Sequence, residues 1–223
     1  MRTVADTERR VRGGLVKITS LLGGVARRIS CTITPVKIIG LSGTNGSGKD
    51  TAGEIVAEKL GYLFVSVSDL LRIELRARNI PVERQHLREL SAEWRREFGL
   101  GVLVDKAVEL AEKSGYPGVV ASPMRNVGEA QHLKDLGGTL VWVDADRRLR
   151  YERIRETHRG RPGEDDKTFE QFCAEEQAEM YPSDPNDPAV LNMAGVRALA
   201  DVTVVNESDL NTLRQGVSAA LVS

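Results

Sequence analysis

The sequence predicts an α/β fold built around a parallel sheet. Short runs of β-branched and aliphatic residues indicate five strands, at residues 36–42, 62–67, 118–121, 139–144 and 202–205. Helical sequence separates each of these runs from the next. Strands that alternate with helices are typical of a parallel sheet, because a crossover helix returns the chain to the edge where the next strand starts.

The expected helices follow the strands in chain order. They cover residues 51–60, the stretch from an N-cap at Asp69 to Pro81, residues 82–98, residues 102–113, and an arginine-rich stretch after residue 146. Two segments rich in Gly, Pro and charged residues, 159–167 and 181–188, are expected to be a small mobile lid and a connecting loop.

Composition restricts the class of function. The 223 residues are 41% hydrophobic, and 31 Lys and Arg against 32 Asp and Glu give a net charge of -1, so binding of nucleic acid through bulk charge is not expected. No apolar run is long enough to span a membrane. Cys31 and Cys173 have neither disulfide-framework nor zinc-site spacing. We therefore expect a cytoplasmic protein, a monomer or homodimer, with no nucleic-acid or membrane partner.

The first 35 residues differ in charge from the rest of the chain. They hold seven Lys or Arg residues and only two acidic ones. Such a segment is either a targeting peptide, which is typically arginine-rich, or an amphipathic helical extension, since apolar residues recur in it at three- and four-residue steps. We treat residues 1–35 as an extension outside the functional domain, which we expect to cover residues 36–223.

The strongest functional signal is a glycine-rich loop where the first strand ends and the first helix begins. It matches the pattern Gly-x4-Gly-Lys, in which glycines turn backbone N–H groups toward phosphate oxygens and the lysine adds a full positive charge. The predicted nucleotide-binding residues are Gly43, Asn45, Gly46, Ser47, Gly48, Lys49, Asp50 and Thr51. This loop predicts that the chain binds the polyphosphate of a nucleotide such as ATP.

One residue of this loop departs from the usual pattern. The Ser or Thr that normally follows the lysine and contacts Mg²⁺ is Asp50, and Thr51 comes one position later. Because a carboxylate beside phosphates would repel them, we predict that Asp50 faces the Mg²⁺ ion and its waters, and that Thr51 contacts phosphate.

The acceptor of a phosphoryl group should bind at the carboxyl edge of the sheet. Asp69 and Arg72 follow the second strand, and Arg125 follows the third, so two arginines reach the edge where open α/β sheets bind ligands. An arginine grips a phosphate through two parallel hydrogen bonds. These residues predict an acceptor that carries an anionic group.

With these residues in view, the chain from about residue 36 to 222 resembles the P-loop nucleoside monophosphate kinase superfamily. It is similar to adenylate kinases, to dephospho-CoA-kinase-like proteins through residues 160–172 and 200–207, and to phage-type deoxynucleoside monophosphate kinases through Lys49-Asp50-Thr51. The resemblance implies a three-layer α/β/α fold with strand order 2-3-1-4-5 and a short lid at about 157–170. It also implies that Arg72 and Arg125 grip the acceptor, and that Arg153 and Asn206 lie near the donor base.

The predicted function is an ATP- and Mg²⁺-dependent phosphotransferase, a kinase for a nucleoside or deoxynucleoside monophosphate. Lys49, Arg125 and the lid arginines Arg159 and Arg161 would share the charge of the transferring phosphoryl group. Relatives commonly carry an Asp where this chain has Ser122, which favours a phosphate acceptor that needs no strong base, although Asp50 or Asp69 would substitute. Two alternatives stay open, a dephospho-CoA kinase and a regulatory ATP-binding module without turnover.

Overall fold

The computed structural model describes residues 36–157, 167–182, 184 and 187–221 of the chain. The predicted basic extension at 1–35 and most of the predicted lid, including Arg159 and Arg161, lie outside the described residues.

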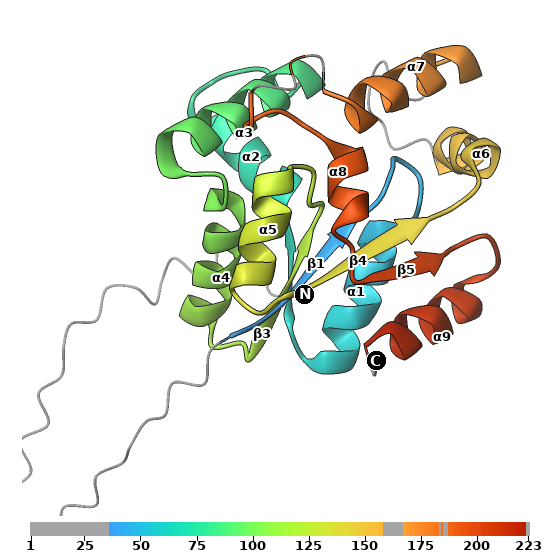
Figure 1. Cartoon of the computed structure of the whole chain (residues 1–223), viewed down its shortest axis with the longest axis horizontal. Helices are drawn as coiled ribbons and strands as arrows, with labels where there is room; N and C mark the ends of the chain where they lie inside the picture. Colours follow the sequence, from blue (N-terminus) through green and yellow to red (C-terminus); the bar gives the residue numbers. More distant parts are fainter. Residues whose placement is uncertain (1–35, 158–166, 183, 185–186, 222–223) are drawn as a thin grey trace, which may run out of the picture. The chain divides into compact units, whose positions relative to one another are not determined.

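Five strands form one parallel sheet in the order β2-β3-β1-β4-β5 (Figure 1). They are β1 (Lys37–Ser42), β2 (Leu63–Ser66), β3 (Gly118–Ser122), β4 (Thr139–Asp144) and β5 (Val202–Val205). The predicted strands and the order implied by the resemblance are both confirmed. Ser66 lies opposite Ser122 in the β2–β3 pair, so the last residues of these strands reach the same edge of the sheet.

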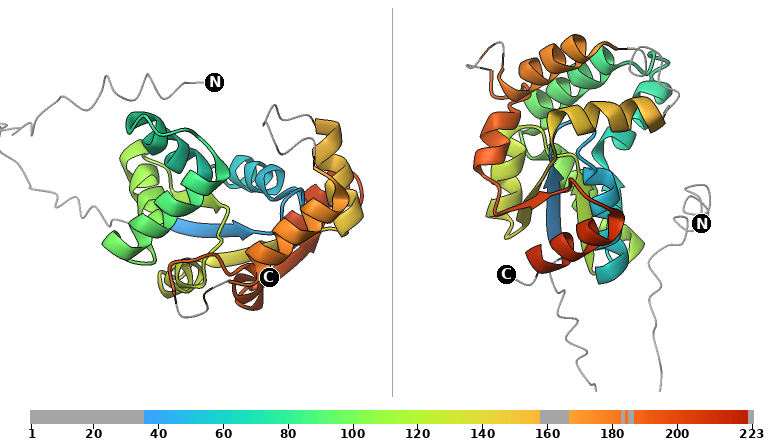
Figure 2. Two further views of the ribbon diagram at one scale, coloured as in Figure 1. Left: turned by 90° about the horizontal axis from the view of Figure 1, so that it is seen from above. Right: turned by 90° about the vertical axis from the view of Figure 1, so that its right-hand side faces the viewer.

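Nine helices occur within the described residues. They are α1 (Lys49–Leu60), α2 (Val67–Ala77), α3 (Arg84–Phe98), α4 (Val102–Ser114), α5 (Val127–Asp135), α6 (Arg147–Thr157), α7 (Phe169–Met180), α8 (Met193–Ala198) and α9 (Leu210–Ala220). Figures 1 and 2 show α1 and α9 on one face of the sheet and α4 and α5 on the other.

Side chains that alternate along each strand contribute to two separate apolar clusters, one on each face of the sheet. In β1, Ile39 and Leu41 pack with Val56 of α1 and Val217 of α9, whereas Ile38 belongs to the cluster on the opposite face. Successive strand side chains point to opposite faces, so a strand covered by helices on both sides is apolar along its whole length. Five of the six residues of β1 are buried for this reason.

Three helix starts differ from the sequence prediction; α3, for example, starts at Arg84 rather than at residue 82. The predicted N-cap Asp69 is wrong, because Ser66 caps α2: its hydroxyl accepts a 3.2 Å hydrogen bond from the Asp69 backbone N–H. The helix therefore follows β2 directly, and Asp69 lies in its first turn, where a carboxylate favours the helix dipole. Similarly, α1 starts at Lys49 rather than at residue 51, because Gly48 is its N-cap.

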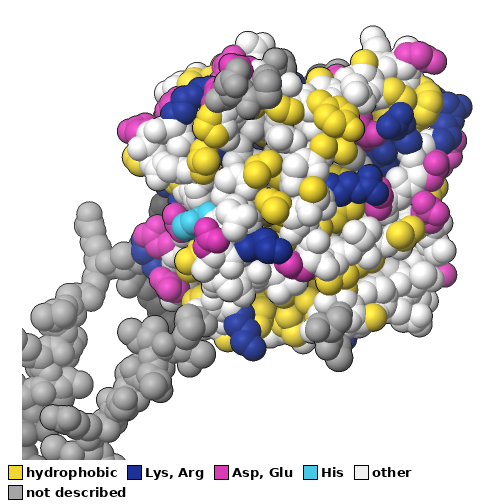
Figure 3. Space-filling view, viewed as in Figure 1, with side chains coloured by type: hydrophobic (Ala, Val, Ile, Leu, Met, Phe, Trp, Pro, Cys, Tyr) yellow, Lys and Arg dark blue, Asp and Glu magenta, His cyan; other side chains and the backbone are white. Residues whose placement is uncertain are grey.

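The surface mixes charges of both signs. On the face drawn in Figure 3, Lys and Arg side chains lie interspersed with Asp and Glu side chains. The pair Arg197 and Asp144, 2.8 Å apart, is one example. Exposed pairs of this kind contribute little to stability.

Candidate active site

The loop between β1 and α1 has a backbone that requires glycine. Gly46 and Gly48 have φ angles of 80° and 88°, in the left-handed region that other residues rarely adopt. A Cβ atom on Gly48 would lie 2.3 Å from Asn206 Nδ2, and one on Gly46 would lie 2.6 Å from the Arg150 carbonyl oxygen. The two glycines thus satisfy both the conformation of the loop and the close approach of its neighbours.

Two predicted donor-site residues support this loop, one directly after β5 and one in α6. The buried Asn206 side chain donates a 2.8 Å hydrogen bond to the Ser47 carbonyl oxygen. Arg153 in turn donates a 2.8 Å hydrogen bond to the Asn206 carbonyl oxygen. The structure therefore brings Arg153, Asn206 and the second half of the loop together.

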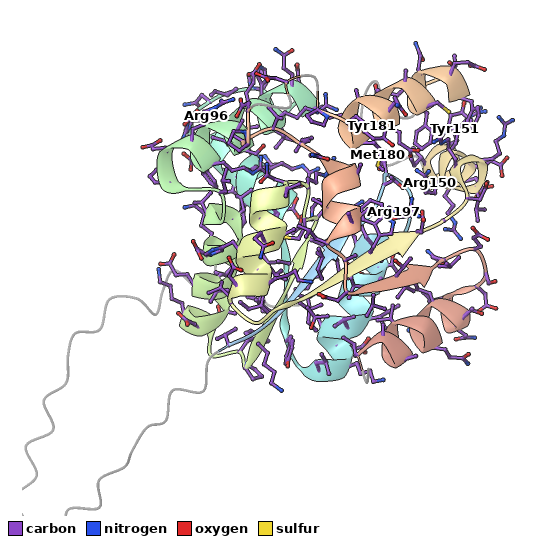
Figure 4. All side chains as sticks on the ribbon, viewed as in Figure 1. Arg96, Arg150, Tyr151, Met180, Tyr181 and Arg197 are labelled. Carbon is purple, nitrogen blue, oxygen red and sulfur yellow. The ribbon has the colours of Figure 1, made fainter. Side chains whose placement is uncertain are left out.

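Arg150 holds the first half of the loop. Its side chain, labelled in Figure 4, is only 4% exposed. It donates to the carbonyl oxygen of Asn45 at 3.2 Å, and its other guanidinium nitrogens donate to Glu176 of α7 and to the Ala145 carbonyl oxygen. Arg150 belongs to the predicted arginine-rich stretch after residue 146, and the sequence indicated no role for it. Its burial depends on the carboxylate of Glu176, which is far away in the sequence.

A cavity of about 270 Å³ opens beside the phosphate loop. Its wall includes predicted site residues from four segments of the chain. They are Asn45, Lys49 and Asp50 of the phosphate loop and α1, Asp69 and Arg72 of α2, and Arg125 after β3. Lys49 is buried, at 7% exposure. The cavity therefore joins the predicted donor lysine to the predicted acceptor arginine. Thr51 is exposed and is not part of this wall.

The unusual Asp50 lies next to the equally unusual Ser122. The Ser122 hydroxyl donates a 2.8 Å hydrogen bond to Asp50 Oδ1. The end of β3 thus has a carboxylate beside it, supplied by the phosphate loop. Ser122 therefore does not disfavour a hydroxyl acceptor, because Asp50 supplies a carboxylate in the same neighbourhood.

The two predicted acceptor arginines have different partners. Arg72 pairs with Asp69 of the same helix at 2.6 Å, so its charge is matched one to one. Arg125 donates to Glu179 of α7 at 2.9 Å. Glu179 also lines the cavity.

The sequence did not indicate Glu179 or the other three arginines of the cavity wall, Arg84, Arg88 and Arg95. Arg88 of α3 donates to Glu179 at 2.8 Å, and Arg84, one helical turn earlier, lies 3.8 Å from the same oxygen. Burial alone would raise the pKa of Glu179, but the charges of Arg125 and Arg84 and the hydrogen bond from Arg88 outweigh it and lower the pKa to about 2. The spacing of Arg84 and Arg88 places them on one helix face, but no local pattern indicates that α7 supplies the carboxylate.

A divalent cation at this site would depend on the nucleotide for most of its ligands. Within the described residues, no group of three or more His, Cys, Asp or Glu side chains is placed to hold a metal ion. Mg²⁺ in phosphoryl-transfer sites is held by one or two protein oxygens together with substrate phosphates and water. The Asp50 carboxylate beside Lys49 fits that requirement.

A known protein family matches the part of the chain that holds this site. The family model described as an AAA domain matches residues 42–170, which include the phosphate loop, Arg72 and Arg125. A UPF0200 protein of Hyperthermus butylicus is 32% identical over 174 residues, which are 78% of this chain and 87% of that protein. The chain belongs to the AAA domain family and to the UPF0200 family. A UPF0200 protein of Pyrobaculum aerophilum is 28% identical over 190 residues, 84% of this chain and 98% of that protein.

Solved structures share the fold of this UPF0200 family member. The crystal structure of shikimate kinase from Bacteroides thetaiotaomicron superimposes with a TM-score of 0.55 at 16% identity, covering 82% of this chain and 96% of that one. The chain therefore has the P-loop kinase fold that its sequence resemblance implied. In the part of the chain that is described, no helix has the length and apolar character needed to cross a membrane.

Proposed function

We propose that the protein is an ATP- and Mg²⁺-dependent phosphotransferase that acts on a small phosphorylated acceptor, a nucleoside or deoxynucleoside monophosphate. One observation carries the proposal: a single cavity runs from the buried Lys49 of the phosphate loop to the arginines around Arg125. Donor and acceptor phosphates bound at its two ends would face each other, which supplies the positioning on which phosphoryl transfer depends.

In this reaction an oxygen of the acceptor phosphate attacks the γ-phosphorus of ATP. A new P–O bond forms, the bond from the γ-phosphorus to the β,γ-bridging oxygen breaks, and ADP leaves with that electron pair. A phosphate acceptor already has a nucleophilic oxygen, so no base is required. Lys49 and Arg125 would stabilise the charge on the transferring group from opposite ends of the cavity.

The remaining predicted roles belong to the same proposal. Asp50, oriented by Ser122, would hold Mg²⁺ together with the donor phosphates, and the metal would supply charge neutralisation there. Arg153 and Asn206 would lie along the nucleotide on the other side of the loop. The roles of Thr51 at phosphate and of Arg159 and Arg161 over the transferring phosphoryl group stay predictions.

A dephospho-CoA kinase is the second candidate, and the position of Asp50 favours it. A hydroxyl acceptor must lose a proton as it attacks, and a carboxylate within the cavity is a suitable group to receive that proton. The monophosphate is preferred because the cavity wall carries three further arginines besides Arg72 and Arg125, namely Arg84, Arg88 and Arg95.

An acceptor panel tests the proposal directly. Full-length protein is incubated with Mg²⁺ and either ATP or GTP, together with each ribo- and deoxyribonucleoside monophosphate or dephospho-CoA, and nucleoside diphosphate release is measured. Turnover that requires a monophosphate is expected. Turnover only with dephospho-CoA would select the second candidate, and nucleotide binding without turnover on any acceptor would indicate a regulatory module. Lys49→Met should abolish turnover, whereas the exposed Lys59→Met on the same helix should not.

A further inference from the structure

Two side chains from distant segments bind alternate carbonyl oxygens of the phosphate loop. Arg150, labelled in Figure 4, reaches the loop from α6 and donates to the Asn45 carbonyl oxygen at 3.2 Å. Asn206, which follows β5, donates from Nδ2 to the Ser47 carbonyl oxygen at 2.8 Å. Each of these carbonyl groups belongs to a residue that directly precedes a glycine of the loop. The two contacts therefore hold the two peptide groups that lead into the glycines.

A carbonyl group that is held in place also fixes the direction of the next N–H group. In a trans peptide, the C=O and the following N–H lie in one plane and point in opposite directions. The peptide bonds that lead into Gly46 and Gly48 are trans, because the one cis peptide bond among the described residues precedes Pro123. The N–H groups of Gly46 and Gly48 therefore point away from the two side chains that hold the loop.

These two N–H groups are available to a ligand. Within the described part of the chain, the Ser47 N–H donates to the Thr44 carbonyl oxygen at 3.2 Å, whereas the N–H groups of Gly46 and Gly48 donate to no other group. Successive backbone N–H groups in a turn form a concave site that binds anions such as phosphate. Groups that have the correct direction before the ligand arrives bind it more tightly, because less ordering is needed.

Both holding side chains are themselves fixed. Arg150 also donates to the Ala145 carbonyl oxygen at 2.9 Å and to the buried Glu176 of α7 at 3.1 Å. Asn206 is 8% exposed, and its own carbonyl oxygen accepts a 2.8 Å hydrogen bond from Arg153. A buried side chain that is bonded on several sides keeps one orientation, which a positioning role requires.

We propose that Arg150 and Asn206 are positioning residues of the phosphate loop, which orient its N–H groups toward the polyphosphate of the nucleotide. The inference rests on the proposed function in that the loop binds a nucleotide. Arg150 acts through the peptide that leads into Gly46, and Asn206 acts through the peptide that leads into Gly48. The Asn206 amide nitrogen thus serves the loop rather than the donor base, so the loss of Asn206 should also weaken a ligand that has no base.

A ligand without a base separates the two possible roles of Asn206. Full-length protein is titrated by calorimetry with tripolyphosphate and with the non-hydrolysable ATP analogue AMP-PNP, each in the presence of Mg²⁺. The variants are Asn206→Leu and Arg150→Met, which keep much of the side-chain volume and remove the hydrogen-bond donors. The matched controls are Asn211→Leu, at an exposed asparagine of α9, and Arg148→Met, at an exposed arginine of α6 that pairs with Glu152.

Both variants should bind tripolyphosphate about 5- to 10-fold more weakly than the wild type, because one N–H donor of the loop is no longer held in place. Asn206→Leu should weaken AMP-PNP binding by the same factor, and both controls should bind like the wild type. Weaker AMP-PNP binding with unchanged tripolyphosphate binding in Asn206→Leu would place Asn206 at the base and overturn its positioning role.

NMR adds a readout that a general loss of stability would not reproduce. In the wild type, tripolyphosphate should shift the amide signals of both Gly46 and Gly48. Arg150→Met should reduce the shift at Gly46 more than the shift at Gly48, and Asn206→Leu should do the reverse. Equal reductions at both glycines in each variant would mean that neither side chain acts on its own peptide, and the inference would be wrong.

Conservative variants keep the test valid if a first variant does not fold. Arg150→Lys retains the charge but cannot bind Asn45, Ala145 and Glu176 together, and Asn206→Asp retains the shape but has no N–H to donate. Weaker tripolyphosphate binding is expected for both, and unchanged binding would overturn the assignment. A wild-type protein that binds neither ligand would contradict the proposed function itself, whereas wild-type binding with unaffected variants would contradict only the positioning role.

Discussion

The hydroxyl of Ser122, at the end of β3, donates a 2.8 Å hydrogen bond to the carboxylate of Asp50, the residue after the phosphate-loop lysine. Phosphate-loop proteins usually place the hydroxyl after the lysine and the carboxylate at a strand end, and both act on Mg²⁺. In this protein the carboxylate, Asp50, follows the lysine, and the hydroxyl, Ser122, lies at the strand end. The two groups are still in contact with each other. The pair therefore keeps one hydroxyl and one carboxylate at the edge of the sheet.

This exchange predicts the outcome of a swap. Asp50→Ser alone should lower the Mg²⁺-dependent gain in AMP-PNP affinity by about 10-fold or more, because the carboxylate near the metal is lost. The double variant Asp50→Ser with Ser122→Asp should recover most of that gain. Calorimetric titrations of AMP-PNP with and without Mg²⁺ measure the effect independently of turnover.

Ser122→Ala is the control for the swap, since it retains the Asp50 carboxylate and removes only the hydrogen bond that orients it. Its effect should be smaller than that of Asp50→Ser. An Asp50→Ser protein with the same Mg²⁺ dependence as the wild type would contradict a metal-facing Asp50.

A second prediction concerns Gly48. An alanine there would adopt a φ of 88° and would place its Cβ 2.3 Å from Asn206 Nδ2, which breaks the hydrogen bond from Asn206 to the Ser47 carbonyl. Gly48→Ala should therefore lower the unfolding free energy by about 1–2 kcal/mol for the backbone conformation and about 1 kcal/mol more for the lost hydrogen bond. AMP-PNP affinity should fall with it. Urea unfolding and nucleotide titration measure the two effects.

Gly115 offers a matched control for Gly48. Its φ is 73°, but a Cβ atom there would have no neighbour within 4 Å. Gly115→Ala should show only the cost of the left-handed conformation and should bind AMP-PNP like the wild type. Equal losses of nucleotide affinity in both variants would mean that the contact between Gly48 and Asn206 does not matter for the loop.

The third prediction is a pH dependence of stability that depends on Glu179. Burial raises its pKa, but Arg125, Arg84 and Arg88 outweigh that effect and lower the pKa from 4.5 to about 2. Because the folded-state pKa is the lower one, the stabilisation is complete above about pH 4.5 and is lost as the pH falls toward 2. The difference in unfolding free energy between the wild type and Glu179→Gln should therefore shrink by about 3 kcal/mol over this interval.

Urea unfolding at a series of pH values between 6 and 2 measures this difference. The exposed Glu58 of α1 serves as the control, because Glu58→Gln leaves the three arginines and their carboxylate intact. If the difference in unfolding free energy between the wild type and Glu179→Gln stayed constant across this pH interval, that result would contradict the assigned ion pairs.

The sheet and the phosphate loop were predictable because their signals are local. The runs at 139–144 and 202–205 match β4 and β5 residue for residue, because β-branched and aliphatic residues are concentrated in both, although only β4 is buried along most of its length. Helix starts were less predictable. Asp69 and Ser66 are both good N-cap residues, and the difference between them depends on where β2 ends, which pairing with β3 decides.

The acceptor side of the cavity was only partly predictable. Arg125 follows a predicted strand, so its place at the sheet edge is implied by the topology. Arg84, Arg88 and Glu179 were missed, because Glu179 lies 91 residues beyond Arg88 and a helical pattern does not indicate which helix packs beside it. The same reason explains why the sequence indicated no role for Arg150, which is buried against Glu176 of a different helix.

By itself, the sequence determined the α/β fold, the phosphate loop with its lysine and the two unusual residues Asp50 and Ser122, because each depends on neighbours within a few positions or on apolar runs. Only the tertiary structure decided that Asp50 and Ser122 touch, that Asn206 supports the loop, and that Glu179 gathers three arginines. These contacts join segments that are distant in the chain, and the packing of helices on the sheet brings their polar groups within hydrogen-bond distance.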